Sequence, residues 1–187
     1  MQLNRSQIKR VGALLLMLVS SASVFADFRV TEGFSQLDND ILRTQSAFNL
    51  DIGPDPLDAL NNGIPLTIAV EMVLSRERSW LPDEKIAQWQ FLYEISYHAL
   101  SGRYVVSEQS SDEYESYSTF NEALQAVEQF TASWQTSDSM TGNDQNYLMK
   151  LRVRLDLTPL PAPIKLVSHV IRQWRQNSGW QQWSVLR

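Results

Sequence analysis

The chain has 187 residues, a formal net charge of −5 at pH 7 and no cysteine. The lack of cysteine excludes disulfides, a cysteine nucleophile and any cysteine-ligated metal site. The acidic charge argues against nucleic acid as a partner, because that binding depends on cationic contacts to phosphate. It also gives no reason to expect affinity for anionic lipid.

Residues 1–26 have the pattern of a secretory signal peptide. Arg5, Lys9 and Arg10 form a positive segment, an apolar run follows, and a small-residue cleavage site ends at Ala26. The apolar run is shorter than the roughly 20 residues that a membrane-spanning helix needs. We therefore expect cleavage rather than retention as an anchor. The remainder, 27–187, is then a single domain without membrane insertion, located in the periplasm or otherwise exported.

The first third of the mature chain predicts a hairpin and a short helix. Strands at Asp27–Thr31 and Ile41–Leu50 are separated by a run of turn-forming residues. Beyond them, Asp55 is the expected cap of a helix of one or two turns, with Pro56 at its first position. Gly63 suits the left-handed conformation that often follows a helix.

The central third contains the clearest strands, Ile64–Leu74 and Ile86–His98, in which apolar and polar residues alternate. Between them, Arg76, Arg78 and Trp80 continue the parity that was apolar before. We therefore expect either a bulge that shifts the register or a strand that leaves the core.

The next segments predict a tight turn at Ser101-Gly102 into a short strand, and then a polar, exposed turn over Ser107–Glu115. A helix is expected over Thr119–Phe130, where Thr119 and Glu122 have the spacing of a capping box. Residues 133–146 form the longest polar linker.

The C-terminal third predicts a strand over Tyr147–Leu157, a helix over Ile164–Trp174 and a last edge strand after Gly179. Six or seven strands with mostly short connections favour antiparallel pairing. The predicted fold is mainly β, an antiparallel β-sandwich with two peripheral helices. The alternative is an α+β fold in which the helix beginning at Thr119 packs on one sheet face.

Several stretches of the chain together resemble a bacterial family of exported proteins, domain-of-unknown-function family 4390. The stretches are Leu60–Thr67, Arg76–Trp80, Tyr97–Val106, Ser118–Phe120, Leu151–Asp156 and the tryptophan-rich C-terminus. The resemblance covers essentially the whole mature chain, and it implies export and a single domain but no activity. One departure is Ser79, where the family often has a second aromatic residue beside the tryptophan.

Arginines and aromatic residues at strand ends are the strongest candidates for binding. Arginine and tryptophan are enriched at binding hot spots, and arginine also grips carboxylates. A Tyr-His strand end lies near an Arg-Tyr strand start, which makes the histidine a candidate acid or base. The predicted binding residues are Arg76, Arg78, Trp80, His98, Arg103 and Tyr104.

The alternative is a purely structural role, in which the arginines pair with carboxylates of neighbouring strands. These would be Glu71, Glu77, Glu94 and Asp156, with Arg152 and Arg154 also taking part. Likewise, Trp174, Trp180 and Trp183 either form a sugar-stacking platform or belong to the core and a sheet edge.

Other chemistry finds little support in the sequence. It contains neither a Gly-x-Ser-x-Gly elbow nor a glycine-rich phosphate loop. Its two histidines, His98 and His169, would need a carboxylate as well to bind a metal. We therefore predict no cofactor and no metal.

The favoured hypothesis is an exported, non-enzymatic interaction domain that binds an envelope or membrane protein. The alternative is a module that binds a small anion or a glycan through the same arginines and the tryptophans. A hydrolase is third. A deep pocket lined by Arg76, Arg78 and Arg103 would count against the first hypothesis.

Overall fold

The computed structural model describes residues 27–111, 113–136, 146–168 and 172–187, so the predicted signal peptide lies outside the described residues. The described chain has helices α2 (Pro54–Asn61), α3 (Phe120–Glu128) and α4 (Ala162–Ser168) and a 3₁₀ turn η2 (Arg172–Trp174). Its strands are β1 (Phe28–Asp38), β2 (Ile41–Leu50), β3 (Leu66–Arg76), β4 (Glu84–His98), β5 (Arg103–Glu108), β6 (Tyr114–Tyr117), β7 (Gln129–Gln135), β8 (Tyr147–Asp156) and β9 (Gln181–Ser184).

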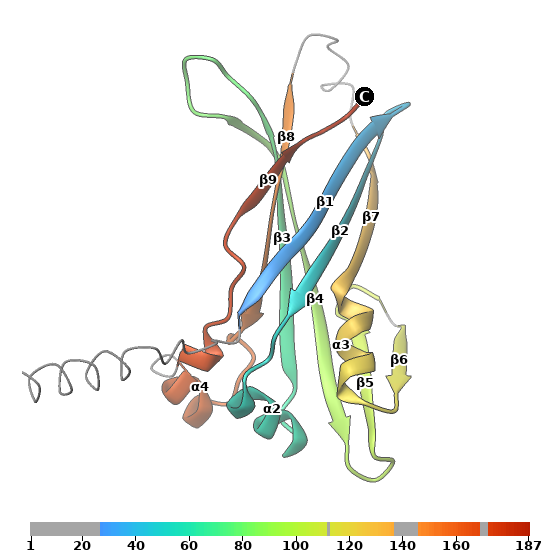
Figure 1. Ribbon diagram of the computed structural model, residues 1–187, viewed down its shortest axis with the longest axis vertical. Coiled ribbons are helices and arrows are strands. Elements are labelled where there is room, and N and C mark those ends of the chain that lie inside the picture. Colours follow the sequence, from blue (N-terminus) through green and yellow to red (C-terminus); the bar gives the residue numbers. More distant parts are fainter. Residues whose placement is uncertain (1–26, 112, 137–145, 169–171) are drawn as a thin grey trace, which may run out of the picture.

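The strands form two antiparallel sheets, which confirms the predicted fold class (Figure 1). The smaller sheet has the order β1-β2-β7, and the larger has the order β6-β5-β4-β3-β8-β9. The long β3–β4 hairpin lies at the centre of the larger sheet, and its strands correspond to the two clearest alternating stretches of the sequence. In the described part of the chain, nine strands take the place of the six or seven expected.

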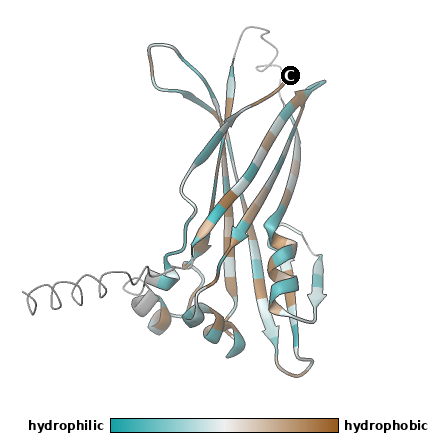
Figure 2. Ribbon diagram, viewed as in Figure 1, coloured by the Kyte–Doolittle hydropathy of each residue, from teal (hydrophilic) through white to brown (hydrophobic). Residues whose placement is uncertain are grey.

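The core lies between the sheets and is built from the alternating apolar positions. Those of β3 are almost completely buried: Leu66, Ile68, Val70, Met72 and Leu74. Aromatic rings meet them from the smaller sheet, since Trp89 stacks on Trp134 with ring centroids 4.3 Å apart. The alternation of hydrophobic and hydrophilic residues along the strands is visible in Figure 2.

The C-terminal segment joins the two sheets along one side. Beyond β9, the Leu186 amide donates to the Ser35 carbonyl (2.8 Å), and the Leu37 amide donates to the Leu186 carbonyl (2.7 Å). The indole N–H of Trp183 also donates to the Ser35 hydroxyl (2.8 Å). Trp183 therefore fastens the edge of one sheet to the edge of the other, as expected for a tryptophan that covers a sheet edge.

A register shift lies between Leu74 and Ser75 in the pairing of β3 with β4. A register shift was one of the two alternatives that the sequence left open here. The skipped residue is Ile86 on β4, because the pairing of β3 with β8 stays regular through Arg76. Arg76 therefore keeps the inward parity of β3 at the end of the strand, where its guanidinium lies over the Tyr147 ring.

The N-terminus of α2 corrects one prediction. The helix begins at Pro54 with Gly53 as its cap, and no side chain caps it, so Asp55 is not the cap and Pro56 is not the first residue. Proline fits the first helical position because it lacks the N–H that would have no partner there, and Pro54 meets that condition first. Gly63 has a φ of +83°, the left-handed conformation expected.

Three strands differ from the sequence-based expectation, and the first is β1, which continues to Asp38 instead of ending at Thr31. Residues 114–117 form β6 where the end of a polar turn and an unassigned segment were expected, and Gln129–Gln135 forms β7 in place of a helix end and a linker. The helix stops at Glu128 because Gln129 is already extended, with φ −107° and ψ 104°. Phe130 fits the apolar stripe of α3 and the inward face of β7 equally well.

Two other predictions fall partly on residues that are not described. The rest of the expected linker, 137–145, lies outside the described residues. So do 169–171, including His169, within the predicted C-terminal helix. The described parts of that helix are α4 and η2.

The capping box at the start of α3 is confirmed and yields a testable prediction. Thr119 Oγ1 accepts from the Glu122 amide (3.2 Å), and Glu122 Oε2 accepts from the Thr119 amide (3.1 Å). Replacing Thr119 with alanine is expected to lower the free energy of unfolding by about 1 kcal/mol, measured by urea denaturation. Thr119→Ser keeps the hydroxyl and should stay near wild type; equal losses in the two variants would refute this role.

Candidate functional site

The six predicted binding residues do not come together. Arg76, Arg78 and Trp80 lie at the β3–β4 connection, whereas His98, Arg103 and Tyr104 lie at the β4–β5 turn. These places are opposite ends of β4, whose 15 residues extend over about 46 Å at roughly 3.3 Å per residue. A single pocket lined by all three predicted arginines is therefore excluded by their positions.

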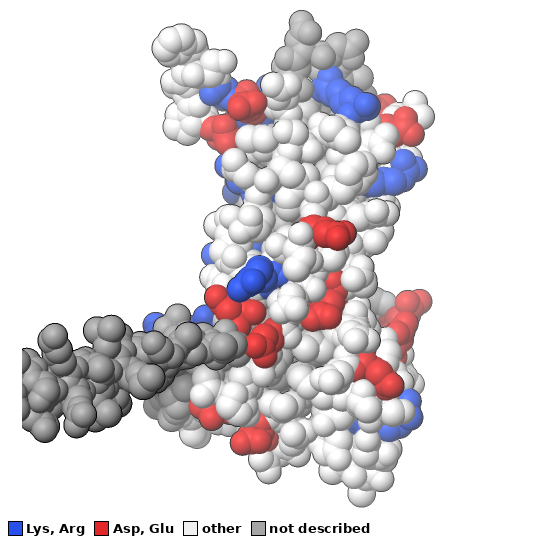
Figure 3. Space-filling view, viewed as in Figure 1, with Lys and Arg blue, Asp and Glu red and all other residues white. Residues whose placement is uncertain are grey.

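The connection between β3 and β4, residues 77–83, projects from the end of the larger sheet, at the upper left of Figure 1. We call it the Trp80 tip. Trp80 is 97% exposed and Leu81 is 63% exposed. In Figure 3 this projection is drawn mostly as uncharged atoms, with charged atoms near its base.

An ion-pair clasp holds the base of the Trp80 tip. Glu84 receives Arg78 at 2.5 Å and Arg76 at 3.4 Å. The hydrogen bond from Arg78 is the main reason why the pKa of Glu84 is lowered, and the positive charges of Arg78 and Arg76 add to it. Both arginines thus join the two ends of the loop, and Trp80, which lies between them and Glu84 in the sequence, remains in solvent.

At the far end of β4, the predicted polar cluster is mostly structural. Arg103 donates to the Ser116 carbonyl (2.7 Å) in β6 and to the Ser118 hydroxyl (3.3 Å), which joins β5 to β6 and to the residues before α3. Tyr104 donates to the side-chain oxygen of Asn61 (2.8 Å). His98 pairs with Arg103 across the turn and is exposed. No hydrogen bond or ion pair joins the His98 side chain to any other described residue.

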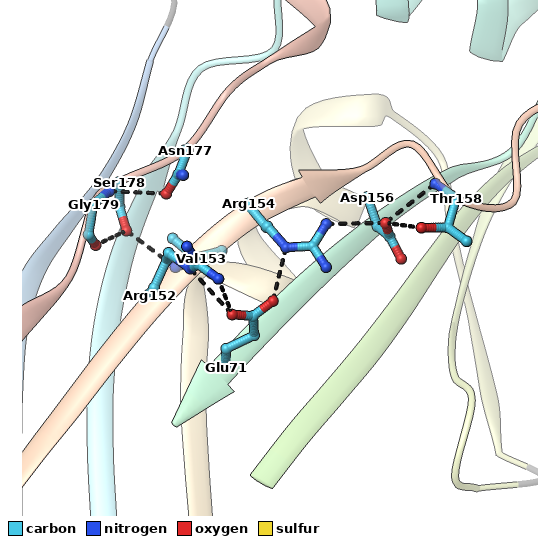
Figure 4. A network of polar contacts seen from close by, with 9 residues as sticks. All are labelled: Glu71, Arg152, Val153, Arg154, Asp156, Thr158, Asn177, Ser178 and Gly179. Carbon is cyan, nitrogen blue, oxygen red and sulfur yellow. Dashed lines mark hydrogen bonds and ion pairs between the residues drawn. The ribbon is translucent and has the colours of Figure 1, made fainter. Parts of the chain in front are cut away.

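The most connected polar cluster lies elsewhere, on the outer face of the larger sheet (Figure 4). Glu71 on β3 accepts hydrogen bonds from Arg152 and Arg154 on β8, with Arg154 Nε at 2.8 Å. Arg154 also donates to Asp156 (2.9 Å), which accepts from the amide and the hydroxyl of Thr158. The sequence had offered the pairing of Arg152 and Arg154 with carboxylates as the alternative to a binding role. The strand register accounts for this pairing, because Arg152 lies directly opposite Glu71.

The ionisation of this cluster is set by two opposing effects. Burial acts to raise the pKa of Glu71, but hydrogen bonds and charges from Arg152 and Arg154 outweigh it and lower that pKa. Asp156 behaves alike: burial opposes its ionisation, and bonds from Arg154 and Thr158 lower its pKa. The charges are thus satisfied within the cluster, and the arginines are not left to bind an anion.

Beside the cluster is a cavity of about 360 Å³ on the same face. A row of polar side chains crosses its floor, since Ser107, Glu94, Thr67 and Asp156 are register partners on four adjacent strands. Leu92 and Pro159 form an apolar part of the cavity wall. Two carboxylates make this cavity unsuited to an anion. Sequence reasoning missed it because Glu94 and Asp156 meet only through the strand order.

Trp180 is half exposed and lies over the guanidinium of Arg152, 4.6 Å from atom to ring centroid. Trp174 is buried in the core and Trp183 covers the sheet edge. The three tryptophans therefore do not form one stacking platform.

The described residues contain no group of three or more His, Asp or Glu side chains that could hold a metal ion. None of the described helices is long and apolar enough to cross a bilayer.

Comparison with known proteins gives one match. Residues 27–184 match the family described as a domain of unknown function (DUF4390). Searches of curated proteins and of solved structures found no match. Because the match spans both sheets and stops just before the last residues, the chain belongs to the DUF4390 family.

Proposed function

We propose that this chain is an exported, non-enzymatic interaction domain that anchors an envelope or membrane protein through the Trp80 tip. The observation that carries the proposal is the almost complete exposure of Trp80 beside exposed Leu81 on a projecting loop. A tryptophan in this position contributes little to the stability of its own domain, whereas tryptophan is among the commonest hot-spot residues of interfaces.

The clasp at the base of the tip supports the same proposal. Arg76 at the end of β3 and Arg78 in the loop both bind Glu84 at the start of β4. A loop that is ordered before binding loses less conformational entropy when it docks, and this favours affinity. Trp80 therefore extends from a loop whose base is held by two ion pairs.

The alternative of an anion site rested on Arg76, Arg78 and Arg103 acting together. Their positions at opposite ends of β4 remove that support. Nor does a specific observation favour hydrolysis, since the described residues place no hydrogen-bonded acid or base beside exposed His98.

The test is replacement of Trp80 with alanine. We expect partner capture to fall by about 30-fold or more, which corresponds to the loss of a hot spot, while the stability of the domain changes by less than about 0.5 kcal/mol. The measurement is a crosslinked pull-down from intact cells, quantified for each captured protein, with urea denaturation of the purified variant.

Trp180→Ala is the matched control, because Trp180 is also exposed but lies on the outer sheet face. It should retain the partner. If the Trp80→Ala variant captures the same proteins as wild type, the proposal is wrong. Binding of the purified chain to protein-free lipid vesicles through Trp80 would also overturn it, because the tip would then recognise lipid.

A further inference from the structure

Strand β7 is an open edge of the smaller sheet. It runs along the right side of the molecule in Figure 1, and the sheet order places β2 on one side of it and no strand of the described chain on the other. On the other edge strand, β1, the backbone groups of Ser35 and Leu37 are hydrogen-bonded to Leu186. Natural edges are usually protected by charged residues, proline or bulges. The sequence of β7, Gln-Phe-Thr-Ala-Ser-Trp-Gln, contains neither charge nor proline, and its pairing with β2 is regular.

The direction of the unpaired backbone groups follows from one hydrogen bond. The Thr136 amide donates to the Asp40 carbonyl (2.7 Å), just beyond the end of β7. Because hydrogen-bonded and non-bonded positions alternate in an antiparallel pair, the backbone groups of Phe130, Ala132 and Trp134 face β2. Those of Thr131 and Ser133 therefore point away from β2, at the open edge.

The sequence of β7 is complementary to itself. When a second copy runs antiparallel about a centre at Ala132, like residues meet: glutamine with glutamine, threonine with serine, alanine with alanine. Thr131 then lies opposite the second copy's Ser133, and these are the positions whose backbone groups point outward. The register that matches like side chains is therefore also the register that pairs the outward backbone groups of the two copies.

The same register brings aromatic residues together on the inner face. Phe130 would lie opposite Trp134 of the second copy, and aromatic cross-strand pairs stabilise sheets. Within one copy these residues already contact β4, with ring centroids 5.0 Å apart for Phe91 and Phe130 and 4.3 Å apart for Trp89 and Trp134. The aromatic layer would thus continue from one copy into the next.

We propose that two copies of this chain pair through their β7 edges, about a twofold axis at Ala132. The pairing is isologous, with the same surface contributed by both copies, as in most homodimers. It joins the two smaller sheets into one and satisfies the outward groups of Thr131 and Ser133. The Trp80 tip lies on another part of the molecule, so the dimer does not depend on the function proposed for that tip.

Cysteine crosslinking tests the register, because the natural chain has no cysteine. Ala132→Cys places two thiols opposite each other at the axis, where Cα atoms are about 4.5 Å apart, within the range that a disulfide bridges. Thr131→Cys is the matched control, since its thiols would be offset by two residues and more than about 7 Å apart. Mild oxidation of the full chain should give at least tenfold more covalent dimer for Ala132→Cys.

Charge replacement tests the interface without a crosslink. The variants Thr131→Glu/Ser133→Glu and Thr131→Lys/Ser133→Glu differ only at position 131, an exposed site. The first places like charges opposite each other across the axis and should sediment as one chain. The second places opposite charges there and should sediment as two chains, like the unmodified protein; circular dichroism checks that both variants fold.

The proposal is overturned if the unmodified protein sediments as a single chain at tens of micromolar. It also fails if both cysteine variants crosslink equally or if the two charge variants have the same mass.

Discussion

Replacing Glu71 with alanine is expected to lower the free energy of unfolding by about 3 kcal/mol, because removal of one member of a buried ion pair leaves its partners uncompensated. Glu71 is 8% exposed and accepts from both Arg152 and Arg154. Without it, two guanidinium groups lie side by side on β8. Urea denaturation measures the change.

Glu94→Ala is the control for this substitution. Glu94 is an exposed glutamate on the same sheet face, and its side chain makes no hydrogen bond or ion pair to the other described residues. Its replacement should change the free energy of unfolding by less than about 0.5 kcal/mol. If the two variants lose equal stability, the cluster around Glu71 is not a stabilising element.

The pH dependence of stability provides an independent check of the same cluster. The pKa values of Glu71 and Asp156 are lowered from 4.5 and 3.8 in the folded state. A lowered carboxyl pKa contributes stability that is complete above the unfolded value and is lost as pH falls through the folded value. Wild type should therefore lose stability below about pH 4, and Glu71→Ala should lose less over that interval. Parallel pH profiles of the two proteins would contradict this assignment.

Replacing Gly33 with alanine is expected to lower the free energy of unfolding by about 2 kcal/mol, the usual scale for overpacking. A Cβ at this position would lie 2.4–2.7 Å from ring atoms of Trp183. The ring cannot easily move away, because its N–H donates to Ser35, whose hydroxyl also shares a hydrogen bond with Thr44 (2.9 Å). The added methyl group therefore separates β1 from β9. Thermal unfolding followed by circular dichroism measures the loss.

A double-mutant cycle with Trp183→Ala distinguishes this clash from a general intolerance of β1. Trp183→Ala alone removes packing and should itself be destabilising. In that background the alanine at position 33 meets no ring, so its additional cost should fall below about 0.5 kcal/mol. An unchanged cost would show that Trp183 is not what excludes a side chain from position 33.

Much of the secondary structure could be predicted because it depends on local pattern. The alternation in β3 and β8 identifies both strands, since one face of each must be apolar to meet the core. The capping box at Thr119 and the left-handed Gly63 are also local requirements. By contrast, β7 could not be separated from the end of α3, because Phe130 satisfies a helical period and a strand period equally.

The candidate site was harder to predict because its geometry depends on distance between segments. Arg78 and Arg103 occur within the same hairpin region of the sequence, yet the length of β4 places them at opposite ends of the sheet. Conversely, Glu71 and Arg152 are far apart in sequence and meet only because β3 pairs with β8.

The sequence by itself therefore determined the antiparallel β class and the absence of cysteine chemistry, because composition and period do not depend on strand order. The family follows from the match over residues 27–184. Only the tertiary structure decided which residues share a surface. It divided the six predicted residues between the Trp80 tip and the β4–β5 turn, where Tyr104 has a structural contact. It also showed that β7 is an edge strand. The physical reason is that strand pairing and register, set by the packing of the whole core, bring side chains together without regard to their spacing along the chain.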